Sequence, residues 1–168
     1  FYAGLTAVAA FFLARSIAGF AAGLVAGLLT LTSGPLFISA AAGFDDAGFA
    51  CFSFICLGLL HRSVSARSTS LLIYSGIAAG FAILEKPTGA ILGPIAGVAV
   101  LLGSPADRAF VLRWLIAWMP PYLLGLGAYS ARSLVASGNP APQMGPLEWI
   151  WKTGGFEALI AVFPTTPT

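Results

Sequence analysis

Residues 32–46 read Thr-Ser-Gly-Pro-Leu-Phe-Ile-Ser-Ala-Ala-Ala-Gly-Phe-Asp-Asp and lie between two long apolar runs. The first run is interrupted at Ser33-Gly34-Pro35, because proline lacks an N–H donor and its ring clashes with the preceding helical turn. A short apolar piece, residues 36–44, follows and ends at the adjacent carboxylates Asp45 and Asp46. We therefore expect a bend at the proline, a short piece that lies flat at an interface or re-enters, and a chain reversal at the aspartates.

The composition around this stretch indicates a protein whose solvent is lipid. Of the 168 residues, 58% are hydrophobic and only 8% are charged, with a mean hydropathy of +0.93. A soluble domain carries about 25% charged residues. Backbone groups in hydrocarbon must pair within their own segment, which favours helices. The expected fold class is all-α, a polytopic transmembrane helical bundle. The net charge of +2 gives no indication of a nucleic-acid surface.

About six spans are predicted, several of them shorter than the ~20 residues that a perpendicular crossing needs. The apolar segments cover residues 1–13, 17–31, 47–60, 70–84, 88–102 and 110–129, the last bent at Pro120-Pro121. A polar loop is expected at residues 63–69. The predicted domains are a transmembrane bundle (1–131), an extracytoplasmic loop with interfacial Trp149 and Trp151 (132–155), and the start of a further apolar segment (156–168). Because apolar segments stand at both ends, we expect a piece of a longer protein.

The charges fall unequally on the two sides of this layout. If each segment crosses once, one side receives Arg15, Arg62, Arg67, Asp107, Arg108 and Arg113. The other side receives Asp45, Asp46, Glu85, Lys86, Arg132, Glu148, Lys152 and Glu157. The positive-inside rule makes the first side cytoplasmic and places the carboxylate pair outside. We expect a multi-pass protein of the plasma membrane, a bacterial inner membrane, with its active face outside the cytoplasm.

Asp45 and Asp46 are the predicted catalytic residues. Charges at membrane depth are costly and are therefore often functional. The alternative is that one aspartate caps the following helix and satisfies its free N–H groups. Two adjacent carboxylates could also contribute to a divalent cation site, although two ligands are a weak signal. The metal requirement stays open.

Glu85, Lys86 and Arg132 are the predicted substrate-binding residues. Glu85 and Lys86 lie between two apolar runs with almost no loop, where Lys86 either binds an anion such as a phosphate or forms an interfacial ion pair. Arg132 is a candidate phosphate contact. His61 is interpreted as interfacial, and the cysteines at positions 51 and 56 as buried small hydrophobes.

Several motifs in this order resemble a known family. Residues 11–15 read Phe-Phe-Leu-Ala-Arg, an apolar run ends in Ser-Gly-Pro, and Asp45-Asp46 open a helix that closes on Arg62. Residues 76–86 then read Gly-Ile-Ala-Ala-Gly-Phe-Ala-Ile-Leu-Glu-Lys. This series resembles the middle of the polyprenyl-phosphate-sugar-dependent glycosyltransferases of the GT-C fold, relatives of protein O-mannosyltransferase and of the aminoarabinose transferase of lipid A. The resemblance covers about residues 11–102.

The resemblance implies an integral membrane enzyme that takes a sugar from a polyprenyl-phosphate donor on the outer face. The acceptor would be a lipid, a glycan or a protein. Asp45 or Asp46 would lie near the active site and Lys86 near the donor phosphate. Gly34 between Ser and Pro, and Glu85 where threonine is common, depart from the family pattern. The family's principal catalytic carboxylate, in the first outer loop, has no match here.

Two other classes compete with the glycosyltransferase. Glycine- and proline-broken helices also suit a secondary transporter or permease, although the segments show no convincing internal repeat. A non-catalytic membrane scaffold subunit is the third possibility. Chemistry at the outer-face charges would favour the transferase, whereas substrate uptake into vesicles would favour the transporter.

Overall fold

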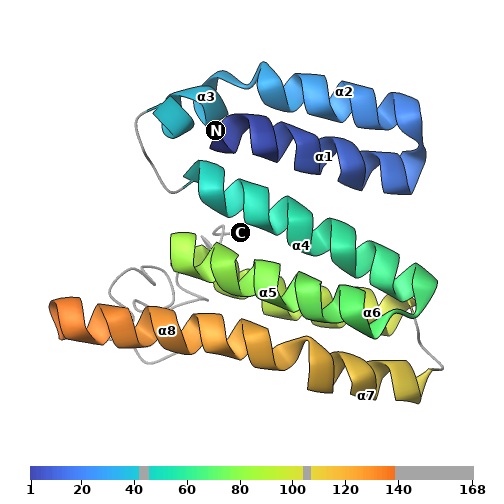
Figure 1. Ribbon diagram of the computed structural model, residues 1–168, viewed down its shortest axis with the longest axis vertical. Coiled ribbons are helices and arrows are strands. Elements are labelled where there is room, and N and C mark those ends of the chain that lie inside the picture. Colours follow the sequence, from blue (N-terminus) through green and yellow to red (C-terminus); the bar gives the residue numbers. More distant parts are fainter. Residues whose placement is uncertain (42–45, 104–106, 139–168) are drawn as a thin grey trace, which may run out of the picture. The chain divides into compact units, whose positions relative to one another are not determined.

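The computed structural model describes residues 1–41, 46–103 and 107–138, and every regular element within those ranges is a helix (Figure 1). In chain order they are α1 (Tyr2–Ala18), α2 (Phe20–Leu31), α3 (Gly34–Ala41), α4 (Asp46–Ala66), α5 (Thr69–Glu85), the 3₁₀ helix η1 (Pro87–Ile91), α6 (Leu92–Gly103), α7 (Arg108–Ala117) and α8 (Met119–Ser137). The predicted all-α class is confirmed for these residues.

The number of membrane spans is not confirmed. Within the described ranges two stretches, Asp46–Ala66 and Arg108–Ala136, are long and apolar enough to cross a membrane. Four apolar helices are shorter: Tyr2–Ala18, Phe20–Leu31, Thr69–Glu85 and Pro87–Gly103. They are short because the chain leaves the helical conformation at Gly19, Ser33 and Lys86, so no uninterrupted run reaches ~20 residues.

The chain divides into two compact units, residues 1–129 and 130–168. In the first unit α1 packs on α2 and α4, α4 also packs on α5, and α5 packs on α7 (Figure 1). In the second unit, α8 continues through Arg132 to Ser137, although the sequence predicted a polar loop from residue 132. The rest of that loop, with Trp149 and Trp151, and the predicted segment 156–168 lie outside the described residues.

The break at Ser33-Gly34-Pro35 is where the sequence predicted it. Helix α2 ends at Leu31, and α3 begins at Gly34 with Pro35 in its first turn, where a missing N–H costs nothing. The eight residues of α3 are ~12 Å long at 1.5 Å per residue, far less than a ~30 Å hydrocarbon core. Helix α3 is therefore too short to cross.

The predicted polar loop at residues 63–69 is wrong, because α4 continues to Ala66. The Ser63 hydroxyl donates to the Leu60 carbonyl at 2.7 Å, and the Ser65 hydroxyl donates to the His61 carbonyl at 3.1 Å. Both hydroxyls therefore find hydrogen-bond acceptors within the helix. The turn is only two residues long. Arg67 adopts a left-handed conformation with φ 53°, and Ser68 caps α5 by accepting from the Leu71 N–H.

The predicted bend at Pro120-Pro121 lies slightly earlier, at Trp118, between α7 and α8. Both prolines fall in the first turn of α8, which tolerates them because its N–H groups have no helical acceptor. Trp118 is fully buried, and its indole N–H donates to Ser75 Oγ at 3.1 Å. Ser75 in turn donates to the Cys56 carbonyl at 2.8 Å, so this buried network joins α4 and α5 to the α7–α8 break.

Glycines allow the helices of the first unit to approach closely. A Cβ on Gly23 would lie 2.9 Å from the Phe11 carbonyl oxygen, so α2 packs backbone against α1. A Cβ on Gly125 would lie 2.4 Å from the Cα of Gly80, so α8 does the same against α5. Small residues at helix contacts are the usual device for close packing in membranes.

Candidate active site

Lys86 leaves helix α5 because of the proline that follows it. A residue before proline is pushed out of the helical region, and Lys86 has φ −147° and ψ 129°. Its N–H still donates to the Ala82 carbonyl at 3.0 Å, so the helical hydrogen-bond pattern continues to the last residue of the turn. A Cβ on Gly89 would lie 2.7 Å from the Ala82 carbonyl carbon, so η1 folds tightly back on α5. The direction in which Lys86 leaves the bundle is therefore fixed by backbone packing.

Asp46 stands opposite this lysine as the first described residue of α4. A carboxylate in a first turn is favoured by the helix dipole. The Lys86 Nζ donates to Asp46 Oδ1, and the two side chains are 41% and 54% exposed. An ion pair this open contributes about 0–1 kcal/mol to stability. Its exposure also leaves both groups accessible to a ligand.

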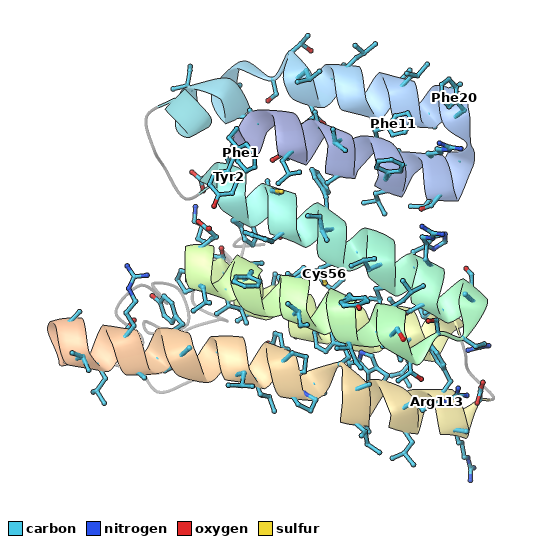
Figure 2. The ribbon with its side chains drawn as sticks, in the orientation of Figure 1. Phe1, Tyr2, Phe11, Phe20, Cys56 and Arg113 are labelled. Carbon is cyan, nitrogen blue, oxygen red and sulfur yellow. The ribbon has the colours of Figure 1, made fainter. Side chains whose placement is uncertain are left out.

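Glu85 brings a second carboxylate to the same end of the bundle. Its Oε1 accepts from the Tyr2 hydroxyl at 3.3 Å, and its carboxyl group lies against Gly48 of α4. A Cβ at position 48 would lie 2.7 Å from Glu85 Oε2, so only glycine allows this approach. Figure 2 shows Tyr2 at the start of α1, beside the first turn of α4.

Thr6 ties the first turns of α1 and α4 together beneath these charges. Its side chain is fully buried, and its hydroxyl lies 2.7 Å from the Tyr2 carbonyl oxygen and 3.2 Å from that of Ala47. A buried hydroxyl with partners on two helices holds them in a defined register. The start of α1, the start of α4 and the end of α5 therefore form one charged cluster: Tyr2, Asp46, Glu85 and Lys86.

The cluster combines groups suited to moving a proton and binding an anion. A carboxylate can accept the proton of a hydroxyl that is becoming a nucleophile. A lysine ammonium is a compact point charge that binds phosphate oxygens. Across the described ranges, no three His, Cys, Asp or Glu side chains are grouped so that they could hold a metal ion.

A comparison with protein families matches residues 2–131 to the family described as dolichyl-phosphate-mannose-protein mannosyltransferase. The chain belongs to this family. Comparison with curated proteins and with solved structures gives no match. This mannosyltransferase family is of the GT-C type and its members are membrane-integral, so the GT-C resemblance seen in the motifs is confirmed. The matched region contains all four residues of the charged cluster.

In this member of the mannosyltransferase family, three of the predicted site residues come together: Asp46, Glu85 and Lys86. Asp45 lies outside the described residues. Arg132 is exposed on α8, in the second compact unit, and its phosphate contact stays a prediction. Membership of the family favours the transferase over the transporter and the scaffold.

The predicted burial of the cysteines is confirmed, whereas the interfacial position of His61 stays a prediction. His61 is exposed ~22 Å along α4 from Asp46, at 1.5 Å per residue, and its Nε2 donates to the Ser16 carbonyl at 3.3 Å. Cys51 and Cys56 are buried free thiols.

The sequence reasoning missed Tyr2 and Gly48. Tyr2 stands in an apolar run, where an aromatic residue is ordinarily a packing or interfacial group. Gly48 comes two residues after the aspartates, and an isolated glycine gives no indication of what approaches it. The available signal was the position of Gly48 two residues after a predicted catalytic acid.

Proposed function

We propose that this chain is part of a membrane glycosyltransferase that moves a sugar from a polyprenyl- or dolichyl-phosphate donor to an acceptor on the extracytoplasmic face. The acceptor class is a lipid, a glycan or a protein. The observation that carries the proposal is the Asp46–Lys86 ion pair beside Glu85, in a chain that belongs to a family named for such a donor.

In the proposed chemistry, Lys86 and Asp46 have different roles. Lys86 binds the donor's phosphate, and Asp46, with Asp45 as its neighbour in sequence, takes the proton of the acceptor hydroxyl. The acceptor oxygen bonds to the sugar carbon as the bond from that carbon to the phosphate oxygen breaks. The phosphate leaves with the bonding electrons, and its developing charge is stabilised by Lys86.

Donor binding would also release the general base. Lys86 is the hydrogen-bond partner of Asp46. A donor phosphate that competes for the lysine ammonium would weaken that bond and leave the carboxylate free to accept a proton. Arg132 is proposed as a further contact to the phosphate, and Glu85 as a group that orients donor or acceptor.

The distribution of charge along the helices supports an extracytoplasmic site. Asp46 begins α4 and Arg62 lies near its end, so the acidic and basic ends of this helix are opposite. Basic residues favour the cytoplasmic side. We therefore place the charged cluster outside the cytoplasm of the plasma membrane.

The test uses the full-length protein in membrane vesicles, supplied with labelled dolichyl-phosphate mannose. The variant Asp45→Asn/Asp46→Asn should lower label transfer about 100-fold or more, in line with loss of a general base. The matched control is Asp107→Asn, because asparagine still caps α7 by accepting from the Phe110 N–H. Undiminished transfer by the double variant, at normal membrane insertion, would remove the catalytic assignment.

A further inference from the structure

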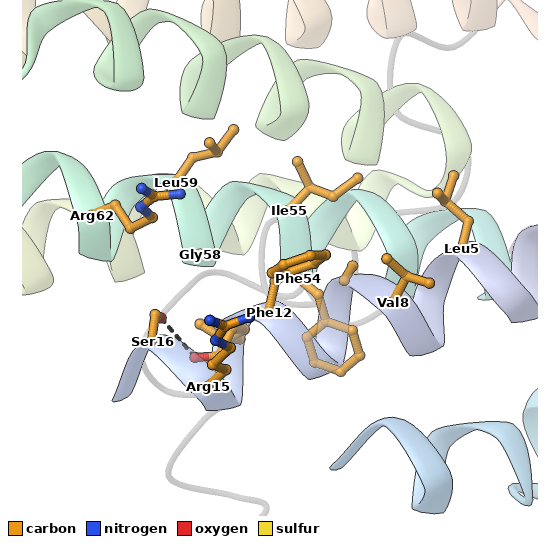
Figure 3. A pocket seen from close by; sticks show the side chains of 12 residues that line it. Leu5, Val8, Phe12, Arg15, Ser16, Phe54, Ile55, Gly58, Leu59 and Arg62 are labelled. Atoms are coloured by element: carbon orange, nitrogen blue, oxygen red, sulfur yellow. Dashed lines mark hydrogen bonds between the residues drawn. The ribbon is translucent and has the colours of Figure 1, made fainter. Parts of the chain in front are cut away.

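A groove of about 750 Å³ lies between α1 and α4; it begins one turn after Tyr2 and runs away from the charged cluster (Figure 3). Leu5, Val8 and Phe12 line it from α1, and Ile55 and Leu59 line it from α4. Val8 and Phe12 are exposed, so the groove is an open apolar channel on the side of the first unit. Its volume is within the ~300–1,000 Å³ range of small-molecule sites.

Two arginines, Arg15 from α1 and Arg62 from α4, lie together at one end of this groove (Figure 3). Both are exposed, and neither is in an ion pair with a described residue. Among the described residues, no acidic side chain lines the groove. In this part of the chain, that end of the groove therefore has two positive charges and no negative charge to balance them.

Arg15 is held in place without using its hydrogen-bond donors. Its guanidinium lies over the rings of Phe11 and Phe20, at 6.0 and 5.8 Å from their centroids. A cation–π contact uses the charge of the guanidinium and not its hydrogen-bond donors, so the N–H groups of Arg15 can still bind an oxyanion. The donor geometry of a guanidinium suits phosphate.

The groove is long enough to hold part of an acyl chain. From Leu5 to Ser16 along α1 the groove runs ~16 Å, at 1.5 Å per residue. A lipid whose phosphate meets the arginines would therefore have ~16 Å of apolar groove for an acyl chain along α1.

We propose that this groove binds an anionic phospholipid of the bilayer, with its headgroup phosphate between Arg15 and Arg62 and an acyl chain along α1 and α4. The occupant is a bilayer phospholipid because the apolar groove ends at two arginines that form no ion pair with a described residue. Basic pockets between membrane helices are known to recognise anionic headgroups. This site is separate from the proposed catalytic cluster and does not depend on transfer chemistry.

The test is native mass spectrometry of the full-length protein, purified in detergent and titrated with phosphatidylglycerol or with phosphatidylcholine. Phosphatidylglycerol should be retained about 25-fold better than phosphatidylcholine, with about 5-fold lost for each arginine removed. The variant Arg15→Gln/Arg62→Gln should bring the two lipids to parity. The control Arg108→Gln/Arg113→Gln removes two other exposed arginines that do not line the groove and should retain the preference.

A second variant tests the apolar part of the groove. A Cβ on Gly58 would only reach ordinary contact with Leu13, at 3.9 Å, so Gly58→Leu should fold and partly fill the groove. It should lower retention of both lipids. Equal retention of the two lipids by the unaltered protein, or an unchanged preference in Arg15→Gln/Arg62→Gln, would overturn the proposal. So would displacement of phosphatidylglycerol by an equal concentration of polyprenyl phosphate, which would assign the groove to a different lipid.

Discussion

Lys86 donates a hydrogen bond from its ammonium group to Asp46, a residue 40 positions earlier in the chain. The contact joins the end of α5 to the start of α4. A local feature of the sequence sets each of these two helix ends. Pro87 ends α5, and the chain enters α4 at a carboxylate that its dipole favours. Two helix ends therefore meet as a pair of opposite charges at one end of the bundle.

Exchanging the two charges separates a structural role from a catalytic one. The variant Asp46→Lys/Lys86→Asp can still form an ion pair, so the free energy of unfolding should change by no more than about 1 kcal/mol. Sugar transfer should fall about 100-fold or more, because the base and the phosphate-binding cation have changed places. Thermal unfolding and label transfer on the same preparation check both outcomes. Transfer restored to the original rate would mean that the pair serves the fold alone.

Gly48→Ala should disturb the position of Glu85 without unfolding the protein. The new Cβ meets only the flexible end of the Glu85 side chain, which can move away. If Glu85 orients a substrate, transfer should fall about 10-fold, since small misplacements at a reacting centre are costly. Gly4→Ala is the control, because nothing lies within 4 Å of a Cβ there. Equal activity of the two variants would argue against a role for the Glu85 position.

Gly125→Ala should destabilise the bundle, whereas Gly127→Ala should not. The Cβ at position 125 would lie 2.4 Å from the Gly80 Cα, and overpacking of this kind costs about 1–3 kcal/mol. Position 127 has open space, and alanine is up to about 1 kcal/mol better than glycine in a helix. Thermal unfolding in detergent should rank Gly127→Ala above Gly125→Ala. The reverse order would mean that α5 and α8 do not approach through these glycines.

The proposed topology can be checked with single cysteines at the two ends of the bundle. Thr88 follows the charged cluster and is exposed, whereas Ser65 is exposed near the end of α4. In intact cells a membrane-impermeant maleimide should label Thr88→Cys and leave Ser65→Cys unlabelled. Background is expected to be low because Cys51 and Cys56 are buried. Labelling of Ser65→Cys alone would reverse the proposed orientation.

The local chemistry of the chain is enough to predict much of this fold. Hydropathy is a property of individual residues, so composition indicates a helical membrane protein before any contact is known. Pro35 breaks a helix by its covalent structure, and the break is where the sequence predicts it. The boundaries at Ser63–Ser65 and Trp118 were misplaced, because they depend on bonds from serine hydroxyls to earlier carbonyls and on a buried indole.

Tertiary packing, and not the local sequence, decides which residues of the charged cluster contact one another. Asp46, Glu85 and Lys86 can each be singled out as rare charges in an apolar chain, because burying a charge in lipid is costly wherever it occurs. Their pairing, and the contribution of Tyr2 and Gly48, arise only when α1, α4 and α5 lie close enough for their ends to touch. That closeness depends on groups far apart in sequence, such as Thr6 against the Ala47 carbonyl. Contacts of this kind are properties of the tertiary structure, since the local sequence constrains a helix but not its neighbours.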